Sequence, residues 1–492
     1  MAAVKAARQP TGSRRITRVA RGRAIQRVFR PRWAVTAASK ATLAADALAP
    51  GQIGGSRTAP VAASVADSVA EPLNAEEAAY LQWDQELVHS SYSNNQQREY
   101  VLSSQQRDDL IEFVKTMLAP AFALGLLDER ASLIFERIEE LVDDYRTGKS
   151  DRIDLLVKPS GVFFTPLRLK QAWLDYDAYV RLSKRTLVAP SFSEIRHILN
   201  LAQIYASTED HDNLRLVTFD GDKTLYEDGH NFSPNSKLVD RLIILMRRGL
   251  NVALVTAAGY PGNPIRYEER IGGLLRGMRE RGLTEEECGR LLVLGGESNF
   301  LFRCDHNCHL QEVPDEEWMT PAQRWCREGA TTVLDVAETT LRTLCRELNL
   351  PAQVVRKQLA VGIIRSEGGK RLEREQLDEV VLTVQAELRK VRLAQGGHLP
   401  PFCAFNGGAD AWVDVGNKYI GLRTLQAYLG LQPRQVLHVG DQFTSVGNDI
   451  STRSACPTIW IRDPSETGRV VKQISRSVRD MDVFANTVTP RE

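Results

Sequence analysis

The amino-acid sequence predicts an α/β fold: a doubly wound parallel sheet with an inserted cap domain and an N-terminal helical domain. Three observations lead to this prediction. Helical patterns fill the chain before about residue 208, short apolar runs alternate with helical patterns after it, and several of those runs end in acidic or hydroxyl side chains. Short apolar runs bounded by polar residues are typical of buried parallel strands, which need crossover helices.

The first segment, residues 1–70, is predicted to be a disordered basic leader. Residues 1–40 hold eleven lysines and arginines and no acidic residue. This composition is typical of an organelle-targeting peptide, plastid or mitochondrial, and a plain basic tail is the alternative. We therefore expect an intracellular protein, cytoplasmic if the leader is not a targeting signal.

Residues 71–208 are predicted to form a helical domain with a core of its own. Four segments space their apolar residues three and four positions apart, which is the helical period. These segments are 105–118, 129–145, 166–182 and 192–205.

The catalytic core is predicted to begin with a strand, a helix and a second strand. The run 214–219 is followed by a helix that Ser233 and Pro234 begin and Gly249 ends, and then by the run 252–255. This order makes a right-handed crossover unit, and ligands of such sheets bind beyond the carboxyl ends of the strands. Further strands are predicted at 291–294, 412–415, 436–439 and 458–461. The predicted boundaries are core 209–262, inserted cap 263–400 and core 401–492.

Composition excludes several classes of protein. With 492 residues, 43% of them hydrophobic, and no apolar stretch of membrane-spanning length, the chain is expected to be globular, with no membrane partner. Residues 41–492 carry 52 basic and 62 acidic side chains, a balance of −10, which argues against nucleic acid as a partner. The seven cysteines suit reduced thiols better than a disulfide framework.

Polar side chains cluster where the predicted strands end. Asp220 and Asp222 follow the first strand, Thr256 follows the second, Lys418 follows 412–415, and Asp441 follows 436–439. An Asp-x-Asp alone is more often a turn or helix-cap device. Four strand ends in the order Asp-x-Asp, Thr, Lys and Gly-Asp resemble the haloacid dehalogenase superfamily of phosphohydrolases, and this resemblance implies a haloacid dehalogenase-like core.

The residue types fit a phosphoryl transfer. Asp220 can attack phosphorus and form an aspartyl phosphate, and Asp222 can protonate the leaving oxygen and later deprotonate water. The repulsion between a phosphate and a carboxylate calls for a divalent cation, and Mg²⁺ prefers oxygen ligands. Asp220, the backbone carbonyl of Asp222 and Asp441 are the predicted metal ligands. Thr256 would donate to a phosphoryl oxygen, and Lys418 would offset the developing negative charge.

Two further residues leave alternatives open. Asp449 lies eight residues after Asp441. It either contacts the metal-ligating residues without binding the metal itself, or it caps a helix. The interval of 162 residues between Thr256 and Lys418 is long enough for a cap that excludes water. Arg365 in this cap is a candidate contact for the substrate phosphate, and a surface arginine is the alternative.

Six longer sequence motifs resemble those of the IMP-specific 5′-nucleotidases. The resemblance covers roughly residues 100–465. The motifs are RDDLIEF from Arg107, PSFSEIRHILNLAQ from Pro190, VTFDGDKTLYEDG from Val217, VTAAGY from Val255, GGESN from Gly295 and CAFNGGADAWVDV from Cys403. The resemblance implies Mg²⁺-dependent hydrolysis of IMP to inosine and phosphate in purine salvage, activation by ATP, and a homo-oligomer, a tetramer.

The resemblance also implies roles for individual residues. Asp222, Asp228, Thr256, Asp410 and Lys418 would contact the substrate, although Asp228 and Asp410 both suit ordinary turns as well. The helical domain would be regulatory and oligomeric, with the ATP effector held by the basic and imidazole side chains Lys184, Arg185 and His197. A lone histidine on a helix is more often structural.

Three other interpretations remain open at the level of sequence. A phosphatase or phosphomutase of the same superfamily could act on a sugar phosphate. A non-catalytic nucleotide-binding regulator is a second alternative, against which the retained Asp220, Asp222, Lys418 and Asp441 argue. Residues 304–309 (CDHNCH) are rich in zinc-type ligands, but structural zinc sites pair two such clusters, and no second cluster is close in sequence.

Overall fold

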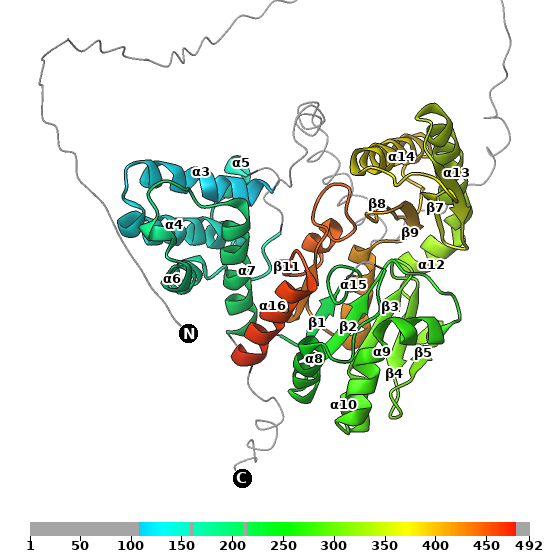
Figure 1. Ribbon diagram of the computed structural model, residues 1–492, viewed down its shortest axis with the longest axis horizontal. Helices are drawn as coiled ribbons and strands as arrows, with labels where there is room; N and C mark the ends of the chain where they lie inside the picture. Colours follow the sequence, from blue (N-terminus) through cyan, green and yellow to red (C-terminus); the bar gives the residue numbers. More distant parts are fainter. Residues whose placement is uncertain (1–107, 158–161, 210–213, 228, 479–492) are drawn as a thin grey trace, which may run out of the picture. The chain divides into compact units, whose positions relative to one another are not determined.

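The computed structural model describes residues 108–157, 162–209, 214–227 and 229–478 (Figure 1). The predicted leader, the start of the predicted helical domain and Asp228 lie outside the described residues.

The helical region, residues 108–209, gathers most of its buried apolar side chains into one cluster, which Phe443 and Trp460 of the sheet region join. Asp108 caps its first helix by accepting from the Ile111 N–H, and Ser191 and Glu194 form a capping box at the start of the last. Phe135 and Trp173 stack in the core with ring centroids 5.1 Å apart. The elements are α3 (Asp109–Ala123), α4 (Leu127–Arg146), α5 (Arg152–Leu156), α6 (Leu169–Val180), η1 (Leu182–Lys184) and α7 (Phe192–Thr208).

The large sheet has seven strands in the order β11-β10-β1-β2-β3-β4-β5. The first five are parallel, and β4 and β5 add an antiparallel edge. The strands are β1 (Leu216–Phe219), β2 (Asn251–Val255), β3 (Leu291–Gly295), β4 (Phe300–Cys304), β5 (Leu310–Glu312), β10 (Val436–Gly440) and β11 (Thr458–Trp460). The order places β1, β2 and β10 side by side, so their carboxyl ends share one rim.

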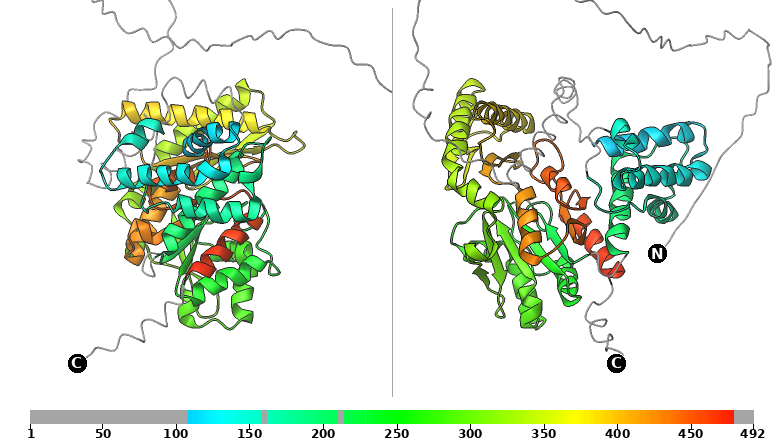
Figure 2. Two further views of the ribbon diagram at one scale, coloured as in Figure 1. Left: turned by 90° about the vertical axis from the view of Figure 1, so that its left-hand side faces the viewer. Right: turned by 180° about the vertical axis from the view of Figure 1, so that it is seen from behind.

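Helices cover both faces of this sheet. One apolar cluster joins the strands to α8, α9 and α16, and a second joins the opposite face to α11 and α15. α8 and α16 lie side by side in both views (Figure 2). The elements are α8 (Lys237–Arg247), α9 (Pro264–Glu280), α10 (Glu285–Gly289), α11 (Asp315–Trp318), α12 (Pro321–Glu328), α15 (Lys418–Leu429), η2 (Pro433–Gln435), η3 (Ile450–Ser454) and α16 (Pro464–Ser477).

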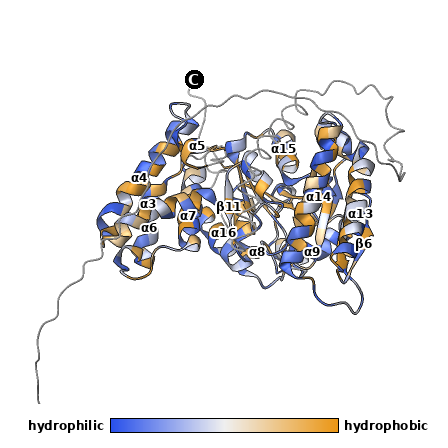
Figure 3. Ribbon diagram, turned by 90° about the horizontal axis from the view of Figure 1, so that it is seen from above, coloured by the Kyte–Doolittle hydropathy of each residue, from blue (hydrophilic) through white to orange (hydrophobic). Residues whose placement is uncertain are grey.

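A second, smaller sheet is antiparallel, with the order β6-β7-β9-β8. α13 and α14 pack on it with their apolar sides, and both colours of the hydropathy scale run along these helices (Figure 3). The elements are β6 (Ala352–Arg356), β7 (Ala360–Arg365), β8 (Phe402–Asn406), β9 (Ala411–Val415), α13 (Ala330–Glu347) and α14 (Arg374–Ala394).

The small sheet corrects one predicted strand. Residues 412–415 were expected in the parallel sheet, but β9 pairs with β7 and β8. A short apolar run carries no information about which sheet it joins, since any sheet buries it equally well. The predicted cap, 263–400, also does not coincide with either sheet, because β3, β4 and β5 lie in the large sheet while β8 and β9 lie in the small one.

Candidate active site

Asp220 lies where β1 ends, at the centre of the large sheet. Its N–H donates to the Val439 carbonyl at 3.0 Å, which continues the pairing of β1 with β10 by one residue. Its carboxylate is buried, with 6% of the residue exposed. Burial raises the pKa of Asp220 to about 6, although the neighbouring Lys418 ammonium opposes this shift.

Lys418 is the buried cation of the site. Asn417 caps α15 by accepting from the Ile420 N–H, so the lysine is the first residue of that helix. Its Nζ lies 2.7 Å from Asp220 Oδ1 and 2.6 Å from Asp449 Oδ1, and no part of its side chain is exposed. The two carboxylates raise the pKa of Lys418 despite its burial, so the ammonium stays charged.

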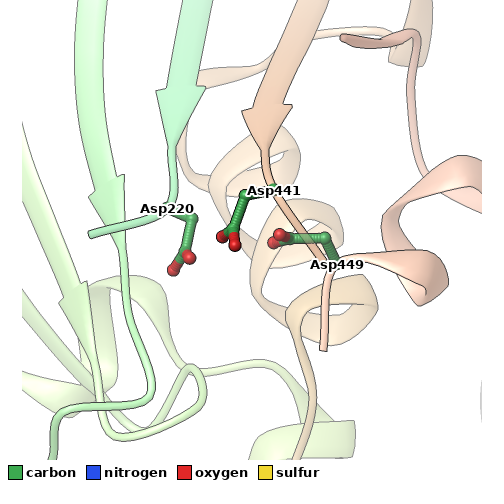
Figure 4. A group of neighbouring side chains, drawn as sticks. All are labelled: Asp220, Asp441 and Asp449. Atoms are coloured by element: carbon green, nitrogen blue, oxygen red, sulfur yellow. The ribbon is translucent and has the colours of Figure 1, made fainter. Parts of the chain in front are cut away.

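Asp441 and Asp449 complete a group of three acids with Asp220 (Figure 4). One carboxylate oxygen from each lies within 4.8 Å of the others. The Asp441 oxygen Oδ1 is buried without a hydrogen-bond partner among the described residues, and burial raises the pKa of Asp441 well above its ordinary value. An orphaned oxygen within a set of oxygen donors fits a hard divalent cation such as Mg²⁺.

Asp449 belongs to this group rather than to a helix cap. Its side chain makes no capping hydrogen bond to η3. It accepts instead from Lys418, from the Gln442 N–H at 2.9 Å and from His438 Nε2, which lies 3.1 Å away. Burial acts to raise the pKa of Asp449, but the charges of Lys418 and His438 outweigh it and lower that pKa.

Asp222 forms an ion pair with Arg270 of α9 and does not belong to the group of three acids. Its carboxylate oxygens lie 2.8 and 2.9 Å from Arg270 Nη2, and one accepts from the Gly229 N–H at 3.0 Å. The guanidinium also lies over the Tyr226 ring. The predicted metal contact of Asp222 is through its backbone carbonyl, and the position of the carboxylate leaves that contact open.

Thr256 follows β2 and is buried beside the Asp220 loop. Its hydroxyl accepts from the Ala258 N–H at 3.1 Å. Gly221 leaves room for it: a Cβ there would lie 3.3 Å from Thr256 Oγ1 and 2.6 Å from the Tyr226 hydroxyl oxygen. The loop between Asp220 and Asp222 therefore depends on a residue without a side chain.

Two predicted substrate contacts, Arg365 and Asp410, lie at one end of the small sheet. Asp410 is in the β8–β9 turn, and Arg365 ends β7, which pairs with the start of β9. The Asn406 N–H beside this turn donates to the Val446 carbonyl, in the loop that joins Asp441 to Asp449. Arg365 is exposed, so it does not belong to the buried cluster.

The three predicted effector residues are each bonded within the chain. Lys184 Nζ lies 2.6 Å from Asp128 Oδ2, and Arg185 pairs with Glu194 at 2.7 Å. His197 contacts Glu466 of α16 and lies 3.3 Å from the Tyr176 hydroxyl. The structure therefore places them in the helical region and at its border with α16, away from the three acids.

Sequence reasoning missed Glu297, a fourth buried acid near Lys418. It lies in the β3–β4 loop with φ of 47°, and Asn448 Nδ2 donates to its Oε1 at 2.7 Å. Burial raises the pKa of Glu297 to about 7, and Lys418 opposes the shift. The motif GGESN contained this residue, but a glutamate after two glycines also suits an exposed turn.

Comparisons with known proteins identify the family of this chain. The chain matches the family model of the IMP-specific 5′-nucleotidases over residues 93–471. IMP-specific 5′-nucleotidase 1 of Yarrowia lipolytica is 40% identical over 405 residues, which cover 76% of this chain and 96% of that protein. That of Plasmodium falciparum is 34% identical over 405 residues, with 80% and 86% covered.

Solved structures give the same result. The structure of the N-terminally truncated, IMP-bound IMP-nucleotidase of Plasmodium falciparum superposes with a TM-score of 0.71 at 34% identity and covers 78% of this chain and 98% of that one. Its ATP-bound counterpart superposes with a TM-score of 0.67 at 33% identity, with 82% and 90% covered. Since the family model spans most of the chain and relatives above 30% identity match nearly their whole length, this protein belongs to the IMP-specific 5′-nucleotidase family.

Proposed function

We propose that this protein is an IMP-specific 5′-nucleotidase, which hydrolyses IMP to inosine and phosphate with Mg²⁺ as cofactor. The observation that carries the proposal is the group of three acids around one buried lysine, Asp220, Asp441, Asp449 and Lys418, in a chain of this family. The IMP-bound structure of a relative supports the choice of substrate.

Asp220 would act as the nucleophile. Its carboxylate attacks phosphorus in line, the bond between phosphorus and the ribose 5′ oxygen breaks, and Asp222 gives a proton to that oxygen as inosine leaves. Asp222 then takes a proton from water, the water attacks phosphorus, and the acyl phosphate bond breaks to release phosphate and restore Asp220. Thr256 would donate its hydroxyl to a phosphoryl oxygen.

The charges of the site suit this reaction. Three carboxylates and one ammonium leave an excess of negative charge, which would repel a phosphate. A cation held by Asp220, Asp441 and the backbone carbonyl of Asp222 would supply the compensating charge and polarise the phosphoryl group. Asp449, bonded to Lys418 and His438, would hold the ammonium toward Asp220.

Asp222 must leave Arg270 for this chemistry. In the structure both carboxylate oxygens of Asp222 accept from Arg270 Nη2. Rotation of the Asp222 side chain on substrate binding would bring it to the leaving oxygen. The ion pair would thus belong to the enzyme before IMP binds.

Substrate choice and regulation would come from the rest of the chain. We propose a cap of residues 330–415, in place of 263–400, because these residues form and cover the small sheet. Asp228, Arg365 and Asp410 remain the proposed cap and loop contacts for IMP. By analogy with the family, we also propose that ATP activates the enzyme and contacts Lys184, Arg185 and His197. The ATP-bound structure of a relative supports ATP as a ligand. A tetramer is likewise proposed by analogy.

A phosphate-release assay across IMP, other nucleotides and hexose phosphates, with and without Mg²⁺ and ATP, tests the assignment. We expect IMP to be turned over best and only with Mg²⁺. Equal or better turnover of a sugar phosphate would favour the alternative phosphatase. Among the described residues, no helix combines the length and apolar character needed to cross a membrane.

Asp220→Asn separates the enzyme from a nucleotide-binding regulator. The amide keeps the shape of the side chain but cannot attack phosphorus. We expect no phosphate release and retained IMP binding, measured by calorimetry. Phosphate release at the wild-type rate would exclude Asp220 as the nucleophile.

A further inference from the structure

Hydrogen bonds join the outer edge of the large sheet to the helical region at Trp460. β11 is the outermost strand, and no strand among the described residues pairs with its outer backbone groups. Asn200 of α7 takes the place of a strand: its Nδ2 donates to the Trp460 carbonyl at 2.6 Å, and the Trp460 N–H donates to Asn200 Oδ1 at 3.1 Å. Arg196, one turn earlier, donates to the same carbonyl and pairs with buried Glu466 at 2.9 Å.

The side chain of Trp460 reaches the three-acid group. Its indole Nε1 donates to the backbone carbonyl of Asp441 at 2.9 Å. Trp460 is 5% exposed. Its ring packs against Phe192 of α7, with centroids 5.5 Å apart, and against Phe443, two residues beyond Asp441, at 5.9 Å.

A second contact runs between the same two regions. The Arg453 guanidinium lies over the rings of both Phe443 and Trp460, and it pairs with Asp108, the cap of α3, at 2.6 Å. The loop that carries Asp441 and Asp449 is therefore held from the helical region by an aromatic stack and by one indole hydrogen bond.

The hydrogen bond from the Trp460 indole to the Asp441 carbonyl matters because few other contacts restrain Asp441. Its Oδ1 has no partner among the described residues, so no side-chain contact fixes that oxygen. The indole restrains the main chain of Asp441 and so fixes the point from which its side chain extends toward the other two acids. Partners that restrain a metal-ligating residue without touching the metal position the ligand and tune metal affinity.

We propose that Trp460 is a positioning residue that aims Asp441 at the cation, and that α7 reaches the site through Asn200 and Trp460. This inference rests on the proposed function, since it assumes that the three acids hold a divalent cation.

Trp460→Phe tests the role of the indole, because phenylalanine keeps an aromatic ring and removes the N–H donor. Trp318→Phe is a matched control: Trp318 is 4% exposed, and its Nε1 donates at 3.2 Å to the carbonyl of Val313, which follows β5 at the opposite edge of the sheet from β11. The readout is calorimetric titration of the full chain with magnesium chloride, without substrate. We expect about tenfold weaker Mg²⁺ binding in Trp460→Phe and no change in Trp318→Phe. Equal affinities in the two variants would overturn the proposal.

Asn200→Ala tests the route from α7 and serves alone if Trp460→Phe does not fold. It removes both Asn200 hydrogen bonds to the Trp460 backbone, at a residue that does not touch the acids, and leaves the bond from Arg196 to the Trp460 carbonyl. We expect weaker Mg²⁺ binding, and no further loss when Asn200→Ala is added to Trp460→Phe, because both act along one route. Unchanged affinity in Asn200→Ala, or losses that simply add, would contradict the route.

The outcome can be told apart from a failure of the proposed function. Mg²⁺ affinities that shift as expected in a protein that does not hydrolyse IMP would contradict the function and leave the positioning role in place. A protein that hydrolyses IMP, and whose Mg²⁺ affinity is unchanged in Trp460→Phe, would contradict the positioning role alone.

Discussion

At the scale of single residues, the charge of Lys418 is what allows two acids to be buried beside it. Its Nζ is within 2.7 Å of Asp220 and within 2.6 Å of Asp449, and the lysine and Asp449 side chains are fully buried. A buried pair is costly to assemble, and removal of one partner leaves an uncompensated charge. The stability of the fold therefore depends on this buried lysine keeping its charge beside the two carboxylates.

We predict that Lys418→Met lowers the free energy of unfolding by about 3 kcal/mol, because both carboxylates lose their partner. Chemical denaturation measures this. Lys170→Met, which breaks an exposed ion pair with Glu136, should cost less than about 1 kcal/mol. Equal costs in the two variants would show that Lys418 does not carry the charge balance.

At the scale of elements, the turn after β1 leaves no space for a side chain. Gly221 lies against the Tyr226 hydroxyl and Thr256 Oγ1, so any added atom presses on a residue proposed to bind the phosphoryl group. Overpacking of this kind costs typically 1–3 kcal/mol.

We predict that Gly221→Ala reduces kcat/KM for IMP about tenfold or more, and that Tyr226→Phe in the same chain restores part of the loss by removing the hydroxyl that meets the new methyl group. Steady-state phosphate release measures both variants. Gly272→Ala in α9, where nothing lies within 4 Å of the added Cβ, is the control. No rescue by Tyr226→Phe would mean that the clash lies elsewhere.

At the scale of the whole molecule, the buried acids make stability depend on pH. Burial raises the pKa of Asp220 to about 6 and that of Glu297 to about 7. Each carboxyl binds its proton more tightly in the folded than in the unfolded chain, so its contribution favours folding at low pH and is lost as the pH rises through these values.

We predict that the free energy of unfolding of the cation-free protein falls as the pH rises from about 4.5 to about 7, and that Asp220→Asn with Glu297→Gln flattens this fall. Burial lowers the pKa of His438, which acts in the opposite direction, so the comparison of wild type with the variant is the measurement. Urea denaturation at several pH values provides it. A variant with the slope of the wild type would contradict the assignment.

Most of the local structure could be predicted from the sequence, because the signals are local. Helical spacing predicted the helices, although the helix expected to begin at Ser233 and Pro234 begins at Lys237, with Ser236 as its cap. Strand ends pointed to Asp220, Thr256, Lys418 and Asp441. The sheet that a run joins depends on partners far along the chain, so 412–415 was assigned to the wrong sheet. The pairing of Asp222 with Arg270 and the burial of Glu297 arise only when β3, α9 and the catalytic loops meet, and no local pattern signals either.

The most direct test of the account asks whether phosphate becomes attached to Asp220. The enzyme is mixed with Mg²⁺ and IMP labelled in its phosphate, quenched in acid within a turnover and digested, and the labelled peptide is sequenced by mass spectrometry. The account predicts an acid-stable, base-labile phosphoryl group on Asp220, absent from Asp220→Asn. Label on another residue, or turnover without any labelled peptide, would contradict it.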